Sequence, residues 1–210
     1  MSNAAMYRCN KEWMSRPDDE RYLSLDEMFD HFVGVREQSR EIVYPSKLMD
    51  VRATEDDDMV VRGIGRDGPD RSLNNWSFDQ ITQLSGSQIG YLKTLHPKLA
   101  PACVTYKLQN VRSIGDVGLL SRDDGDIHTL PAATGPKYGR VWNAGFVDAI
   151  RHHVGDGRNG DWTVPGEFGK AVPITKANTT LYASDRDLFV FLADEKTRSR
   201  CQIGGMVSRG

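Results

Sequence analysis

The chain has 210 residues, of which 39% are hydrophobic and 27% charged, and its formal net charge at pH 7 is -2. These values are ordinary for a soluble globular protein, and a chain of this length can bury a core without disulfides or metals. No apolar run approaches the roughly 18 residues that a membrane-spanning helix needs, so we expect no membrane partner. Cys9, Cys103 and Cys201 lie far apart without a CxxC pair, which argues against a cysteine zinc site and favours a cytoplasmic location.

The small net charge hides an asymmetry along the chain. Residues 17–58 hold thirteen Asp/Glu and five Lys/Arg, a balance of -8, so the remainder carries +6. A solvated acidic helix face and loop would explain this imbalance. The alternative is a bipolar molecule whose later part faces a polyanion.

We expect residues 1–16 to form a disordered or tag-like tail. Residues 17–210 are expected to form a single α+β domain that is truncated at its C-terminus. Its first helix starts where Ser24 and Glu27 have the spacing of a capping box. One apolar stripe then follows at helical spacing, made of Leu25, Met28, Phe29, Phe32 and Val33.

Two strands, residues 47–54 and 59–64, are expected on either side of the acidic turn at residues 55–58. The pattern GxGxxG follows at residues 63–68 and recurs at 155–160. A dinucleotide site needs a strand before this pattern and a helix beginning at it. The first copy leads into a loop and the second follows a helix, so both are expected to be turn glycines.

Helices are expected through the middle of the chain. A second capping box, Ser77 with Gln80, should begin one of them and Gly86 should end it. Helices over residues 87–95 and 97–111 follow. The second of these is expected to bury one apolar face, with Cys103 as a small core residue; the face consists of Leu99, Cys103, Val104, Leu108 and Val111.

The second half is expected to be mainly strands. A hairpin of residues 117–120 and 127–130 precedes a helix from Asn143 that Gly155 ends. Strands are expected at residues 162–164, 170–175, 179–183 and 188–193, the last of them a central strand covered on both faces because its apolar run does not alternate. We therefore predict an α+β fold with a helical N-terminal half packed on a mainly antiparallel sheet, formed largely by the C-terminal half.

Signatures of catalysis are missing from the sequence. It has no GxSxG elbow, no phosphate-binding GxxxxGK[ST] loop and no HExxH zinc motif, so we expect no catalytic residues, no metal and no cofactor. Adjacent helical residues point about 100° apart, which makes His152 and His153 a poor metal pair. Asp185 and Asp187 could hold a divalent ion; the alternative is a turn in which Arg186 neutralises them.

Polyanion binding is the chemistry that the residues support best. Residues 137–142 carry two cations and two aromatic rings, as phosphate contact and base stacking require. The alternative is that Tyr138 and Trp142 are core aromatics. The residues predicted to bind nucleic acid are Lys137, Tyr138, Arg140, Trp142, Asn143, Lys170, Lys176, Asn178 and Arg186.

Several runs resemble the DUF932 family of phage and plasmid-like proteins, whose function is unknown. They are residues 75–80, 90–95, 136–143, 164–170 and 175–187, and the resemblance extends from about Trp13 to the end of the chain. It implies a role in mobile-element DNA metabolism or in countering host defence, and members are typically longer. The family has no established catalytic residues to carry over.

Three functions follow from these observations. The leading expectation is a non-enzymatic nucleic-acid-binding protein of a phage or plasmid, engaging single-stranded DNA. The second is a protein-interaction module that counters a host defence protein through the acidic residues 17–58. The third is a metal-dependent enzyme acting on nucleic acid through Asp185 and Asp187.

Overall fold

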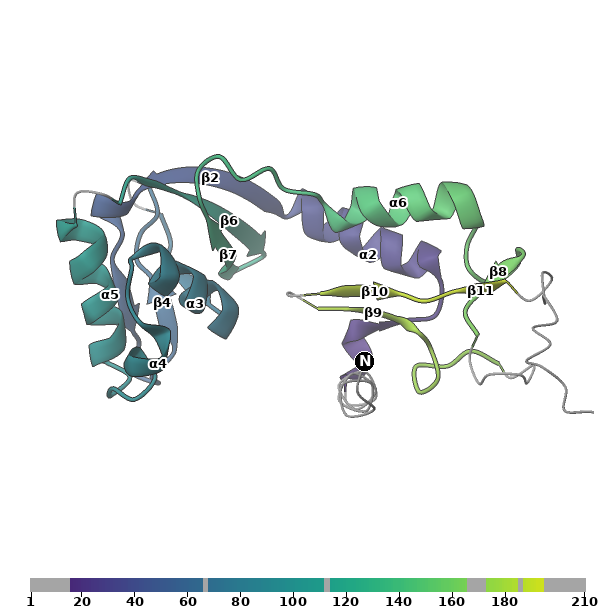
Figure 1. The fold of residues 1–210 in the computed structure, drawn as a ribbon, viewed down its shortest axis with the longest axis horizontal. Coiled ribbons are helices and arrows are strands. Elements are labelled where there is room, and N and C mark those ends of the chain that lie inside the picture. Colours follow the sequence, from purple (N-terminus) through teal and green to yellow (C-terminus); the bar gives the residue numbers. More distant parts are fainter. Residues whose placement is uncertain (1–15, 66–67, 112–113, 166–172, 185–186, 195–210) are drawn as a thin grey trace, which may run out of the picture. The chain divides into compact units, whose positions relative to one another are not determined.

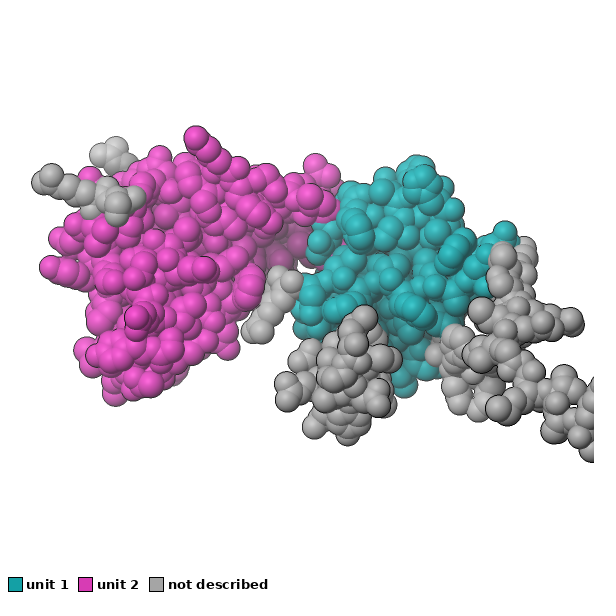
Figure 2. Space-filling view, in the orientation of Figure 1, with its two compact units in different colours: residues 1–31, 143–210 teal, residues 32–142 magenta. Residues whose placement is uncertain are grey.

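The computed structural model describes residues 16–65, 68–111, 114–165, 173–184 and 187–194 of an α+β protein (Figure 1). Its contacts divide the chain into two compact units (Figure 2): unit 1 holds residues 1–31 and 143–210, and unit 2 holds residues 32–142. The division into units describes contacts within the chain, and the expectation that residues 17–210 form a single domain remains a prediction. Among the described helices, none has the length and apolar character that crossing a membrane requires.

Unit 2 is built on a six-stranded mixed sheet. The strand order is β2-β6-β7-β5-β4-β3, and every neighbouring pair is antiparallel except β5 and β7. The largest sheet therefore comes from the middle of the chain, and the expected helix-then-sheet division is not confirmed. The strands are β2 (Ser39–Pro45), β3 (Val51–Ala53), β4 (Met59–Val61), β5 (Arg71–Leu73), β6 (Asp116–Asp124) and β7 (Ile127–Thr134).

A bulge interrupts the central hairpin of this sheet. The pairing of β6 with β7 shifts from Leu120↔Ala132 to Arg122↔Thr129, so two residues of β7 lie opposite Ser121. One of the two is Pro131. Proline lacks the N–H that a ladder hydrogen bond needs, and a bulge is the place where an interior strand tolerates it.

Two helices pack on the sheet, α3 (Asn75–Leu84) against β7 and α5 (Leu99–Asn110) against β3, and the short α4 (Ile89–Leu92) packs against α3. The capping box predicted at Ser77 and Gln80 is wrong by one turn. Asn74 is the N-cap, since its Oδ1 accepts the Ser77 N–H at 2.7 Å while Ser77 Oγ accepts the Asn74 N–H at 3.1 Å. Gln80 instead accepts the Ala133 N–H of β7 at 2.9 Å.

The buried face of α5 is rotated from the predicted one. Ala100, Val104 and Leu108, at i, i+4 and i+8, enter the core, whereas Cys103 is exposed. The expected burial of Cys103, and of Leu99 and Val111, is therefore wrong. Ala100 and Pro101 are buried instead, and the side of the helix opposite them carries Leu99 and Cys103.

Unit 1 contains two small antiparallel sheets, ordered β1-β9-β10 and β11-β8. The apolar run at residues 188–193 was expected to be one central strand, and that prediction is wrong. The run breaks into two short strands in different sheets, and Phe189 and Phe191 are exposed. The elements are η1 (Asp18–Glu20), β1 (Arg21–Tyr22), β8 (Trp162–Thr163), β9 (Leu181–Ala183), β10 (Leu188–Val190), β11 (Ala193–Asp194) and α6 (Asn143–Val154).

The helix α2 (Leu25–Glu37) runs across the boundary between the two units at residues 31 and 32. Its predicted start is confirmed, because Ser24 Oγ accepts the Glu27 N–H at 3.1 Å. Glu27 reaches back to the N–H of Leu23, at 2.5 Å. The predicted hairpin around the acidic turn is also confirmed, because β3 pairs with β4. The strand expected at residues 170–175 is not confirmed: its described residues, 173–175, are not in a strand.

The N-cap of α3 can be tested by substitution. We expect Asn74→Ala to lower the free energy of unfolding by about 1 kcal/mol, because one helix N–H loses its side-chain acceptor. Urea denaturation followed by circular dichroism measures the change. The exposed neighbour Asn75 is the matched control, and Asn75→Ala should change stability by less than about 0.5 kcal/mol; equal losses in both variants would contradict the assignment.

Candidate nucleic-acid interface

The predicted cluster of cations and aromatics lies on the segment between β7 and α6, residues 135–142, which we name the aromatic loop. It belongs to unit 2. A turn begins it, in which the Tyr138 N–H donates to the Gly135 carbonyl at 3.1 Å. Lys137 is exposed and the Tyr138 side chain is 59% exposed, whereas Trp142 is half-buried. Tyr138 is thus not a core aromatic, and Trp142 is only partly one.

Each aromatic ring of the loop lies next to a guanidinium. Arg140 Cζ is 5.7 Å from the centroid of the Tyr138 ring, and Arg36 Cζ is 5.6 Å from that of Trp142. These distances are within the range of cation–π attraction. Arg36 comes from the last turn of α2, and no local pattern connects it to a loop about a hundred residues later, so the sequence did not indicate it.

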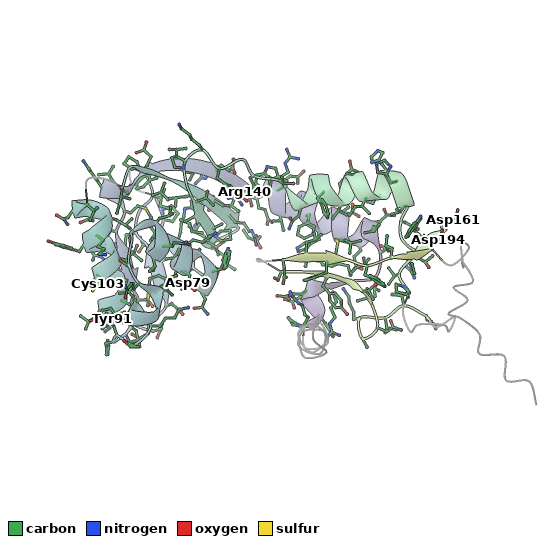
Figure 3. All side chains as sticks on the ribbon, viewed as in Figure 1. Asp79, Tyr91, Cys103, Arg140, Asp161 and Asp194 are labelled. Carbon is green, nitrogen blue, oxygen red and sulfur yellow. The ribbon has the colours of Figure 1, made fainter. Side chains whose placement is uncertain are left out.

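Arg140 has a second partner on the outer strand β2. Its Nε donates to Glu41 Oε1 at 2.8 Å, and its side chain is only 17% exposed (labelled in Figure 3). A phosphate would have to compete with Glu41 for this guanidinium. Lys137 is therefore the more accessible cation of the aromatic loop.

The predicted residues of unit 1 hold its local structure. Lys176 Nζ contacts Glu27 Oε1 at 3.0 Å and the Arg21 carbonyl, and lies 5.5 Å from the Tyr22 ring centroid. Asn178 accepts the Thr175 N–H at 2.7 Å within its own turn. Asn143, half-buried, is the first residue of α6.

The nine predicted residues thus fall into separate parts of the molecule. Four of them lie on the aromatic loop of unit 2, and three others, Asn143, Lys176 and Asn178, are described residues of unit 1. Lys170 and Arg186 lie outside the described residues. That all nine form one site stays a prediction.

The acidic pair proposed for a metal is only partly described. Asp185 lies outside the described residues. Asp187 accepts hydrogen bonds from Arg16, at 2.5 Å, and from Ser184 Oγ, at 2.7 Å. Over the part of the chain that the structure describes, no three His, Cys, Asp or Glu residues are grouped so that they could hold a metal ion.

Sequence reasoning missed a charged cluster on the sheet of unit 2, which we name the Asp123 cluster. Arg71 of β5 is fully buried, and its Nη1 lies 2.5 Å from Asp123 Oδ1 on β6. His128 Nδ1, directly across the hairpin on β7, is 2.8 Å from the same oxygen. Arg40 Nη2 of β2 lies 3.4 Å from Asp123 Oδ2. The hairpin around Gly125 could have suggested the pairing of Asp123 with His128, but nothing local predicts Arg71.

The cluster changes the acidity of its carboxyl group. The hydrogen bond from Arg71 is the main reason that the pKa of Asp123 falls from its ordinary 3.8 to about 2, with help from the His128 hydrogen bond and the charges of Arg71 and Arg40. Partial burial acts in the opposite direction. Asp123 therefore stays ionised across the physiological range and neutralises the buried Arg71.

No protein-family model, no curated protein and no solved structure matches the chain. The resemblance to DUF932 therefore stays a prediction. The assignment of the candidate interface is therefore supported by its residues and their geometry alone.

Acid unfolding tests the Asp123 cluster. A carboxyl group whose pKa is lower in the folded state stabilises the fold above its unfolded pKa, and the contribution is lost as pH falls through the folded pKa. We expect the free energy of unfolding to fall more steeply between about pH 4 and about pH 2 in the native protein than in Asp123→Asn. At neutral pH the variant should be less stable by about 1.5–3 kcal/mol, the range for a hydrogen bond to a charged group.

The matched control is the neighbouring Asp124, which is exposed and whose Oδ1 accepts a hydrogen bond from Gln38 Nε2 at 3.4 Å. Asp124→Asn should keep the pH dependence of the native protein. Parallel pH profiles for the native protein and Asp123→Asn would contradict the role of the cluster.

Proposed function

We propose that this protein binds nucleic acid without catalysing a reaction on it, and that it engages single strands. The observation that carries the proposal is the exposed Tyr138 ring, flanked by the exposed Lys137 and by the Arg140 guanidinium. Unpaired bases stack on such rings, and phosphates are neutralised by such cations.

The arginines next to Tyr138 and Trp142 support a role for both rings in base stacking. A guanidinium beside a ring limits the orientations that the ring samples, so less conformational entropy is lost when a base stacks on its free face. Because Arg140 also contacts Glu41, we assign it to positioning Tyr138, and Lys137 to phosphate contact. Through the DUF932 resemblance, we further propose that the protein serves a phage or plasmid in the cytoplasm.

A second candidate is supported by the acidic turn between β3 and β4. Its four carboxylates, Glu55, Asp56, Asp57 and Asp58, are all exposed. Asp57 has the left-handed φ of 64°, which makes the turn tight. Such a group of negative charges can present a basic partner protein with a polyanion-like surface, as a module that counters host defence would require.

The nucleic-acid proposal is tested by fluorescence anisotropy with labelled single- and double-stranded oligonucleotides over a series of salt concentrations. We expect Tyr138→Ala to weaken single-strand binding by about 1–3 kcal/mol, the cost of losing one stacked base. Lys137→Ala should reduce the slope of log affinity against log salt by about 0.7, the contribution of one phosphate contact.

Arg62, an exposed cation of the same unit outside the aromatic loop, gives the control Arg62→Ala, which should leave both quantities unchanged. Unaltered affinity in Tyr138→Ala together with an unaltered salt slope in Lys137→Ala would exclude the aromatic loop as the binding surface.

The acidic-turn candidate has a separate test. If the turn attracts a basic partner, replacing Asp56, Asp57 and Asp58 by Asn should reduce capture of polylysine by at least tenfold at low salt, because three of the four charges are lost. Surface plasmon resonance measures the capture. Equal capture by the native and substituted proteins would remove this candidate.

A further inference from the structure

One long stretch of unit 2 has no acidic residue. Residues 80–115 contain four Lys/Arg and no Asp/Glu, although 29 acidic residues in a chain of 210 would place about five in a stretch of this length. The stretch includes the second half of α3 and all of α4 and α5. Any neutralisation of its cations must therefore come from other segments, as when Asp79 contacts Lys93 at 2.8 Å.

Two tyrosines of this stretch project into solvent. The side chains of Tyr91 on α4 and Tyr106 on α5 are 63% and 69% exposed. Their neighbours Leu92, Val104 and Leu108 are in the core, so burying these three fixes the helices with the tyrosines facing outward. Figure 3 shows the labelled Tyr91 and Cys103 at the end of unit 2 that carries α4 and α5.

The outer side of α5 forms a continuous stripe. Leu99, Cys103 and Tyr106 lie at i, i+4 and i+7, on the side of the helix away from the buried Ala100 and Val104. Two of its members, Leu99 and Cys103, had been predicted from the sequence to lie in the core.

Cations flank the stripe. Lys107 reaches toward the end of α3, where its Nζ donates to the Gly86 carbonyl at 3.0 Å. That contact holds the ammonium group in place next to a neutral oxygen instead of a carboxylate. Lys98, which precedes α5 directly, is exposed.

We propose that the outer face of α4 and α5 is a second surface for single-stranded nucleic acid, on which Tyr91 and Tyr106 stack with bases while Lys98 and Lys107 contact phosphates. Stacking needs unpaired bases, which selects single strands over duplexes. This surface shares no residue with the aromatic loop, so substitutions can test nucleic-acid binding at each surface separately.

The positive charge of this face favours nucleic acid over a second copy of the same chain as its binding partner. An exposed apolar helix stripe can also bind a second copy of the same chain, but that contact would bring Lys98 and Lys107 of the two copies close to one another. Juxtaposed like charges weaken association, whereas a phosphate backbone neutralises them and releases counterions.

The test is anisotropy with a fluorescent oligothymidylate. Tyr91→Ala and Tyr106→Ala should each weaken binding roughly 5- to 150-fold, and Lys98→Ala should lower the salt slope by about 0.7. Phe191→Ala removes another exposed ring, from unit 1, and should leave oligonucleotide binding unchanged. Far-ultraviolet circular dichroism verifies that each variant is folded, and unchanged binding in the folded Tyr91→Ala, Tyr106→Ala double variant would overturn the proposal.

Photocrosslinking separates this surface from the aromatic loop. An oligonucleotide containing 5-bromouracil, irradiated with the full chain and digested for mass spectrometry, should link to peptides holding Tyr91 or Tyr106. Links confined to Tyr138 would overturn this proposal and support the aromatic loop, whereas links confined to Tyr91 and Tyr106 would do the reverse. Absence of oligonucleotide binding by the native protein would overturn both.

Sedimentation velocity tests the alternative occupant. The native protein is expected to show no dimer that depends on Tyr106. A dimer that dissociates in Tyr106→Ala, with oligonucleotide binding unchanged, would assign this face to self-association and overturn the proposal.

Discussion

The sheet of unit 2 depends on compensating the charge of one buried guanidinium, that of Arg71. Arg71 is 1% exposed, and a buried charge is tolerated only where a partner of opposite sign compensates the loss of hydration. Asp123 provides that charge from β6, while Arg71 sits on β5 and His128 on the strand between them. Because β5 has only three residues in the sheet, this interaction helps to hold the β3–β4 hairpin in register with the rest of the sheet.

The same sheet positions both proposed binding surfaces. The aromatic loop leaves β7 directly, and Glu41 of β2 holds its Arg140, so fixing β2 against β6 and β7 fixes the surroundings of Tyr138. On α5, Thr105 Oγ1 accepts the Val51 N–H of β3 at 2.8 Å, and Gln109 donates to the Met49 carbonyl at 2.9 Å. Side chains attached to rigid elements lose little freedom on binding.

Helix ends and hairpins, which neighbouring residues determine, could be predicted from the sequence, whereas contacts between distant segments could not. The starts of α2 and α6, the end of α3 at Gly86 and both hairpins of the sheet follow from caps, stripes and turn residues a few positions apart. The phase of α5 does not, because Leu99 and Ala100 are both apolar and only the sheet selects between them. Arg36 beside Trp142 and Arg71 beside Asp123 join segments that are far apart in sequence. The candidate site could therefore be predicted only as a list of residues, four of which lie on the aromatic loop.

The outer position of β2 has a consequence for solubility. The strand is seven residues long and, among the described strands, pairs only with β6; the outer edge of such a strand can pair with another molecule and start aggregation. Arg40, Glu41 and Pro45 oppose this, since charges and a missing N–H discourage a further strand. Glu41 thus has two effects: it holds Arg140 in the aromatic loop, and it helps to prevent the sheet from extending into a neighbouring molecule.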